Sequence, residues 1–122
     1  MARFVLSAEA QDDIDDVVLY SRELFGEDAG YRYETLLLTA LRDIAADPMR
    51  PGSHEVTKGG PGTRAYHIRY SRLRVPGGRI REPRHIIFYR SLTPGLIGIS
   101  RILHERMDPT RHAPGRFAGH QR

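Results

Sequence analysis

Three arginines and one histidine near the carboxyl end of the chain have the clearest potential for chemistry. Arg101, His104 and Arg106 lie close together, and Arg90 belongs to the apolar segment just before them. An imidazole changes charge near neutral pH, so His104 could act as an acid, a base or a donor to phosphate. Guanidinium groups bind phosphates and carboxylates through paired hydrogen bonds. The set predicts a surface for an anionic partner or, if His104 transfers protons, a site that cleaves phosphodiesters.

Simpler structural roles compete with this interpretation. His104 follows an apolar run, so it could be a hydrogen-bonded histidine that anchors the end of a strand. The arginines could be solvated side chains on a strand, paired with Glu105 or Asp108. Both interpretations stay open at the level of the sequence.

No metal or cofactor site is expected. His54, His67 and His85 do not have the spacing of metal ligands. The chain has no cysteine, which excludes disulfides and thiolate zinc sites. A run of four aspartates spreads over several faces of a predicted helix and is interpreted as a solvated surface near its positive end. These aspartates are Asp12, Asp13, Asp15 and Asp16.

Charge is divided unevenly along the 122 residues. Residues 1–55 carry 12 acidic and 5 basic side chains, whereas residues 56–122 carry 14 basic and 3 acidic ones, so the formal net charges are −7 and +11. Thirteen of those 14 cations are arginine, which favours a nucleic acid or an acidic protein as partner. No apolar run approaches the roughly 20 residues that span a bilayer, and no signal-like stretch opens the chain, so we expect a cytoplasmic protein.

The elements that position these residues follow from periodicity. Residues 3–6 are a strand candidate, and Ser7 is a suitable N-cap for a helix that follows. Apolar residues then recur at intervals of three and four over residues 8–25 and 29–46, which predicts a helical hairpin. Its apolar stripes include Leu24, Phe25 and Tyr33. Turn-forming residues fill 48–62 and predict a loop. Alternation over residues 64–70, 85–92 and 96–103 predicts three strands. Tyr66, Tyr70 and Tyr89 on these strands could stack on bases if exposed, but core positions are more common for such residues.

The predicted architecture is an α+β domain over residues 1–108, in which a short N-terminal strand and an α-helical hairpin pack on an antiparallel β-sheet. We expect the strands to extend into the arm at residues 71–84, which contains a Pro-Gly-Gly turn. Residues 109–122 are basic and almost without apolar side chains, so we expect a mobile tail.

Element order and three motifs resemble the ParE toxins of the RelE/ParE superfamily of bacterial toxin–antitoxin systems. RHIIFYR at residues 84–90 is similar to the HxIFYR strand of ParE, ISRILHERMD at residues 99–108 to its xRxLHxRRD ending, and SAEA at residues 7–10 to its opening SPEA. The resemblance covers about residues 3–112. Met107 stands where the family often has a second arginine, and the arm at residues 71–84 is longer than in a minimal ParE hairpin.

The resemblance implies a toxin that inhibits DNA gyrase by binding and is neutralised by a ParD-like antitoxin. Arg90, Arg101, His104 and Arg106 would then bind the target rather than catalyse, and nucleic acid would be contacted only through the target complex. The alternative is a ribosome-dependent mRNA endoribonuclease of the RelE branch. There a histidine would move protons and arginines would stabilise the transition state. The residues for that alternative are His104 or His67 with Arg69, Arg90 and Arg101.

Overall fold

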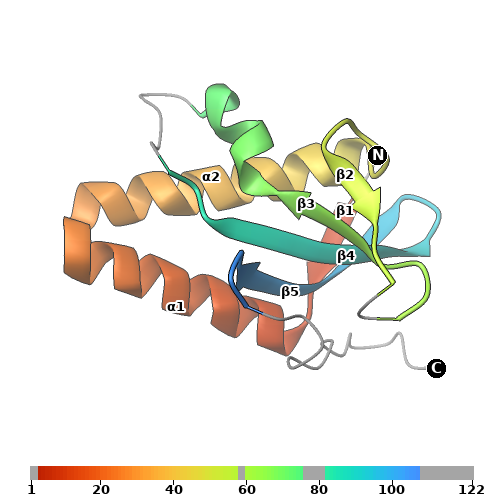
Figure 1. Ribbon diagram of the computed structural model, residues 1–122, viewed down its shortest axis with the longest axis horizontal. Coiled ribbons are helices and arrows are strands. Elements are labelled where there is room, and N and C mark those ends of the chain that lie inside the picture. Colours follow the sequence, from red (N-terminus) through yellow and green to blue (C-terminus); the bar gives the residue numbers. More distant parts are fainter. Residues whose placement is uncertain (1–2, 58–59, 76–81, 108–122) are drawn as a thin grey trace.

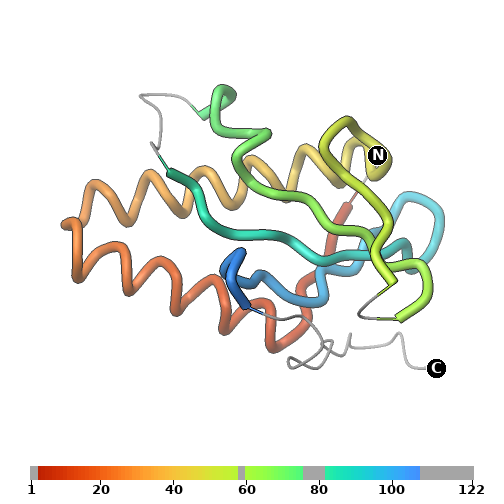
Figure 2. Tube along the Cα trace, in the orientation of Figure 1, coloured from red at the N-terminus to blue at the C-terminus, as the bar shows by residue number. Residues whose placement is uncertain are grey.

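Two long helices follow one short strand at the amino end of the chain (Figure 1). The computed structural model describes residues 3–57, 60–75 and 82–107. Strand β1 (Arg3–Leu6) leads into α1 (Ala8–Phe25), and α2 (Glu27–Ala46) follows after a single residue, Gly26. Gly26 has a φ of 96°, which glycine adopts without strain. Figure 2 shows the two helices side by side and reversing direction at this residue, so the predicted helical hairpin is confirmed.

Ser7 ties the start of α1 to the sheet. Its Oγ accepts a hydrogen bond from the Ala10 N–H at 2.9 Å and donates one to the Ser100 carbonyl at 2.8 Å. The first contact caps an otherwise unpaired donor of the helix, as expected from the sequence. The second fixes the helix against a strand that lies 93 residues away in sequence.

Five strands form one mixed sheet in the order β1-β5-β4-β3-β2. Its other members are β2 (Ser53–Glu55), β3 (Arg64–His67), β4 (His85–Thr93) and β5 (Leu96–His104). The last four pair antiparallel, as predicted for β3, β4 and β5, whereas β1 joins β5 in parallel with Arg3 opposite Leu96. Strand β2 lies in the segment predicted to be a loop, where its three residues are too few to show a periodicity.

The prediction of a strand through Tyr70 that extends into the arm is wrong. Strand β3 ends at His67, and residues Ile68–Arg74 form a 3₁₀-helix, η1. The physical reason is a buried carboxylate on α2: Ser71 Oγ donates to Asp43 Oδ2 at 2.6 Å, and Arg74 Nε lies 3.1 Å from Asp43 Oδ1. The Pro-Gly-Gly turn at residues 76–78 and the predicted tail at residues 109–122 lie outside the described residues.

The contacts of Asp43 form a network that we call the Asp43 network. The hydroxyl groups of Tyr66 and Ser71 are 2.7 Å apart. Because Ser71 gives its proton to Asp43, Tyr66 donates to Ser71. Arg50 Nη1 lies 3.8 Å from Asp43 Oδ1. Asp43 is only 6% exposed, so its charge is stabilised by these partners rather than by water.

The main hydrophobic core lies between the hairpin and one face of the sheet. It joins Leu36, Leu41 and Ile44 of α2 to Ile87 of β4 and Ile99 of β5. A smaller cluster on the other face contains Ala65, Phe88 and Leu103. No helix in the described part of the chain is long and apolar enough to cross a membrane.

Candidate functional site

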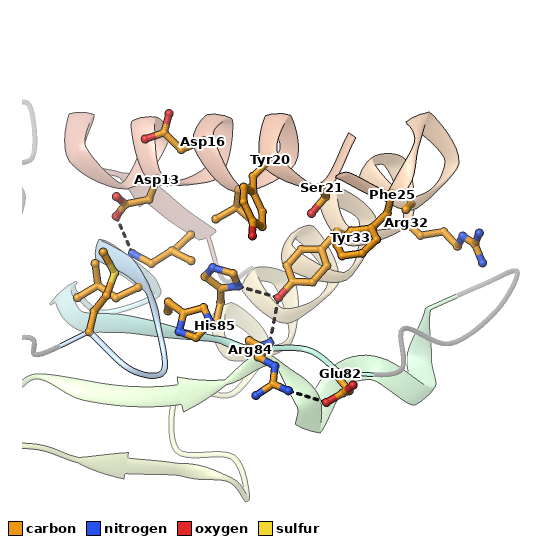
Figure 3. Close-up of a pocket in the computed structure, with 16 residues that line it drawn as sticks. Asp13, Asp16, Tyr20, Ser21, Phe25, Arg32, Tyr33, Glu82, Arg84 and His85 are labelled. Carbon is orange, nitrogen blue, oxygen red and sulfur yellow. Dashed lines mark hydrogen bonds and ion pairs between the residues drawn. The ribbon is translucent and has the colours of Figure 1, made fainter. Parts of the chain in front are cut away.

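A cavity of about 1030 Å³ opens between the helical hairpin and the adjoining ends of β4 and β5. Its apolar lining comes from both layers: Val17, Tyr20 and Phe25 on the hairpin, and Ile102 and Leu103 on β5. Figure 3 shows Tyr20 on the α1 side of the cavity and His85 and Arg84 across from it. We call this cavity the groove.

Large apolar side chains are exposed at the rim of the groove. Tyr20 is 62% exposed and Phe25 is 71% exposed, and Leu24 beside them is also exposed. Contiguous exposed apolar surface of this kind is typical of a protein-binding site, because leaving it in water is unfavourable. Periodicity had assigned Leu24 and Phe25 to the stripe that faces the core. The structure places both in solvent, at the end of α1 where the sheet no longer covers the helix.

Tyr33 and His85 form a hydrogen-bonded pair in the groove. The Tyr33 hydroxyl lies 2.7 Å from His85 Nδ1 and accepts the backbone N–H of Arg84 at 3.0 Å. Burial raises the pKa of Tyr33 to about 12, so the hydroxyl keeps its proton. Burial, reinforced by His104 and His67, lowers the pKa of His85 to about 4. His85 is therefore a neutral imidazole at physiological pH.

Three histidines lie at the same end of the sheet, on three adjacent strands. His85 is opposite His104 in the β4–β5 register, with ring centroids 5.4 Å apart and rings nearly perpendicular. His67 ends β3, and its Nε2 lies 2.8 Å from Glu105 Oε1 while its Nδ1 accepts the Arg69 N–H. The hydrogen bond from His67 lowers the pKa of Glu105. Glu105 also pairs with Arg84 at 3.1 Å.

Arg101 is bound to α1. Its Nε and Nη2 each lie 2.8 Å from a carboxylate oxygen of Asp13, and the Ile102 N–H donates to Asp13 Oδ2 at 2.9 Å. The Arg101 side chain is only 18% exposed. The interpretation of Asp13 as a solvated aspartate is therefore wrong. Its carboxylate binds the part of β5 that extends past the end of β1.

The four predicted target-binding residues do not form one cluster. His104 lines the groove, whereas Arg90, Arg101 and Arg106 do not. Arg90 follows the core residue Tyr89 on β4, so strand alternation places it on the sheet face away from the helices. Arg106 is exposed after the end of β5.

Sequence reasoning missed most of the groove. Tyr33 had been placed in the core stripe of its helix, and His85 had been considered only as a metal ligand. His85 lies beside His104 because of the β4–β5 register, and Tyr33 reaches the Arg84 N–H from α2. Both arrangements depend on tertiary contacts. Within residues 3–57, 60–75 and 82–107 no group of three or more His, Asp or Glu side chains could hold a metal ion.

Comparisons with known proteins agree with this architecture. Residues 4–109 match the family described as ParE toxin of type II toxin-antitoxin system, parDE. A solved structure, described as a chromosomal ParDE TA system from P. aeruginosa, superposes with a TM-score of 0.63 at 15% sequence identity. The match covers 85% of this chain and 96% of that one, and at this identity it shows the shared fold. A search of curated proteins found no match.

Proposed function

The chain belongs to the ParE toxin family of type II toxin–antitoxin systems, and on this premise we propose that it inhibits DNA gyrase by binding and is neutralised by a ParD-like antitoxin. The observation that carries the proposal is the groove, which combines exposed aromatic side chains with the hydrogen-bonded pair of Tyr33 and His85. Such a surface is suited to binding a protein. The site of action would be the cytoplasm, where gyrase works on DNA.

The antitoxin would occupy the groove. An amphipathic helix or an extended segment could cover Tyr20 and Phe25, since both modes place apolar anchors in a preformed depression. Tyrosine and phenylalanine are frequent anchors of protein interfaces. Covering Tyr20 and Phe25 would remove two large exposed aromatic side chains from water.

Gyrase, or its cleaved complex with DNA, would contact Arg90 and Arg106. Arg90 and Arg106 have no ion pair within the described residues, so their guanidinium groups can bind carboxylates or phosphates of the target. His104 would contribute a hydrogen-bond donor from the groove side. Arg101 would contribute mainly through the position of β5, because its guanidinium already binds Asp13.

Hydrogen bonding around the histidines favours binding over catalysis. His104 Nδ1 accepts the backbone N–H of Arg106 at 3.1 Å, so the neutral ring carries its proton on Nε2 and has no free lone pair for a general base. His67 is held between Arg69 and Glu105 in the same tautomer. Neither arrangement suits the proton abstraction that the ribonuclease alternative needs.

Two assays with the purified chain test the proposal. Added to gyrase, plasmid and ATP, the chain should accumulate cleaved DNA complexes, and added to translating ribosomes it should leave mRNA intact. Arg90→Ala and Arg106→Ala should each weaken gyrase inhibition in a step of about 1 to 3 kcal/mol.

His104→Gln keeps a hydrogen-bond donor and should also reduce inhibition only in a step. If His104→Gln instead lowers mRNA cleavage by about 100- to 10,000-fold while ribosome binding persists, the ribonuclease function replaces this one.

A further inference from the structure

The groove contains two imidazole rings whose hydrogen-bonding capacity is only half used. His85 and His104 both line the groove, and they face one another across β4 and β5. Among the described residues, Nδ1 is the only ring nitrogen of either histidine with a hydrogen-bond partner. Figure 3 shows the Tyr33 hydroxyl directed toward His85.

The partners of Nδ1 determine the tautomer of each ring. Arg106 N–H can only donate, so His104 Nδ1 must be an unprotonated acceptor. Tyr33 keeps its hydroxyl proton, and His85 Nδ1 is the one acceptor for it among the described residues. In both neutral rings the proton therefore sits on Nε2, which makes each Nε2–H a donor.

Both Nε2 atoms are reachable from the groove. Within the described residues, the fully buried side-chain nitrogens and oxygens that lack a partner are Nε of Arg50 and Nε of Arg64. The Nε2 atoms of His85 and His104 are not in that group, so each keeps contact with solvent. Since both side chains line the groove, this contact is on the groove side.

The charges around the two donors select the kind of acceptor. Of the charged side chains that line the groove, Asp13 is paired with Arg101 and Glu82 with Arg84, and the charges of Asp16 and Arg32 balance. A carboxylate would therefore find no surplus positive charge. A cation would find no acceptor on the rings, because both Nδ1 atoms are occupied. A neutral oxygen needs no surplus positive charge and can accept the Nε2–H groups, and its desolvation costs far less than that of an ion.

We propose that His85 and His104 form an amide-recognition subsite, in which their Nε2–H groups donate to amide carbonyl oxygens of the segment that fills the groove. In naming that segment as part of the antitoxin, the inference rests on the proposed function. Once a segment fills the groove, the apolar wall excludes water from the contact. The two donors then fix the register of the bound segment. A partner that presents only apolar side chains here leaves both donors unpaired, which is unfavourable.

Imidazole ¹⁵N NMR spectra of the full chain with three small probes test the chemistry directly. The free protein should show Nε2–H tautomers for both histidines at pH 7. N-(2-phenylethyl)acetamide should shift both Nε2 signals in a saturable way, whereas 3-phenylpropionate should bind at least about tenfold more weakly and 2-phenylethylamine should not shift them. A different tautomer, absent amide binding, or tighter binding of either charged probe overturns the proposal.

Antitoxin affinity separates this inference from the proposed function. His85→Phe and His104→Phe keep a ring but remove the donor, and each should weaken antitoxin binding roughly tenfold. The matched control is His54→Phe, which makes the same change on the exposed strand β2 outside the groove and should leave binding unchanged. Thermal unfolding shows whether each variant is folded. If His85→Phe does not fold, the antitoxin affinity of His104→Phe tests the proposal.

The pattern of losses identifies which idea fails. If Tyr20→Ala weakens antitoxin binding and both histidine variants do not, the antitoxin uses the groove without the amide subsite, and the inference is wrong. If Tyr20→Ala and both histidine variants all bind normally, the antitoxin docks elsewhere. The proposed docking then fails, and the inference that the antitoxin fills this subsite fails with it.

Discussion

The Asp43 network and the groove both lie where the helices meet the sheet, but they differ in how their polar and apolar groups are placed. In the Asp43 network a buried carboxylate has a hydroxyl and guanidinium groups as partners, and little of it meets water. In the groove, aromatic side chains are exposed and two imidazoles keep an unused donor. We therefore expect changes in the Asp43 network to act mainly on stability and changes in the groove wall to act mainly on binding.

The largest expected effect comes from removing the carboxylate of the Asp43 network. Asp43→Ala leaves Ser71 without its acceptor and Arg50 and Arg74 without their carboxylate, so the free energy of unfolding should fall by about 3 to 4 kcal/mol. Urea denaturation measures the loss. Asp28→Ala removes an exposed carboxylate from the same helix and should cost less than about 1 kcal/mol. Equal losses in the two variants would contradict the assignment of stability to this network.

The next effect is a dependence of stability on pH that arises in the groove. The pKa of His85 is about 4 in the folded chain and about 6.5 in an unfolded one. Between these values the unfolded chain binds the extra proton, so stability falls as pH drops from about 6.5 to 4. The loss at pH 4 relative to pH 7 should be roughly 2 to 3 kcal/mol.

The variant His85→Phe isolates this contribution from the carboxylates that titrate in the same range. Urea denaturation at pH 7 and pH 4 should show a smaller pH dependence for His85→Phe than for the original chain. His54→Phe should keep the full dependence, because His54 is exposed. An unchanged dependence in His85→Phe would show that this histidine is not buried neutral.

A moderate effect is expected where α1 meets the edge of β5. Asp13→Ala and Arg101→Ala should each lower the free energy of unfolding by about 2 kcal/mol, because the pair shares two hydrogen bonds away from bulk solvent. The double variant should lose less than the sum of the two. Asp12→Ala removes an exposed neighbour and serves as the control. Additive losses would mean that Arg101 is stabilised by other groups.

The smallest effect on stability is expected in the groove wall, together with a large effect on binding. Tyr20→Ala and Phe25→Ala should change the free energy of unfolding by no more than about 0.5 kcal/mol. Antitoxin affinity, measured by calorimetry, should fall at least about tenfold. Tyr31→Ala is a matched control, since Tyr31 is exposed but does not line the groove. A large loss of stability would show that Tyr20 and Phe25 contribute to the core rather than to a binding surface.

Local patterns predicted most of the elements. The periodicity of the two helices, the cap at Ser7 and the two long strands depend on neighbouring residues, and the structure confirms them. The 3₁₀-helix η1 was not predictable, because the contact of Ser71 with Asp43 overrides the alternation that continues to Tyr70. The parallel pairing of β1 with β5 joins the two ends of the domain and leaves no local signal.

The candidate site was predicted less well than the fold. His104 was singled out and does line the groove, but the partner of Arg101 was expected nearby in sequence and is Asp13, 88 residues away. Charge and side-chain type are visible in a sequence, whereas pairing is decided by which surfaces meet. The residues that distinguish the groove, Tyr33 and His85, have ordinary neighbours and acquire their properties only from burial.

The parallel pairing of β1 with β5 also bears on how the toxin is made. The first strand to leave the ribosome has no partner until Leu96–His104, the last strand of the sheet, has been synthesised. Contacts of such long sequence separation form late and slowly. The edge of β5, the start of α1 and the groove between them therefore assemble only when translation is nearly complete. An unfinished chain therefore lacks the groove, so any binding through the groove has to wait until synthesis is nearly complete.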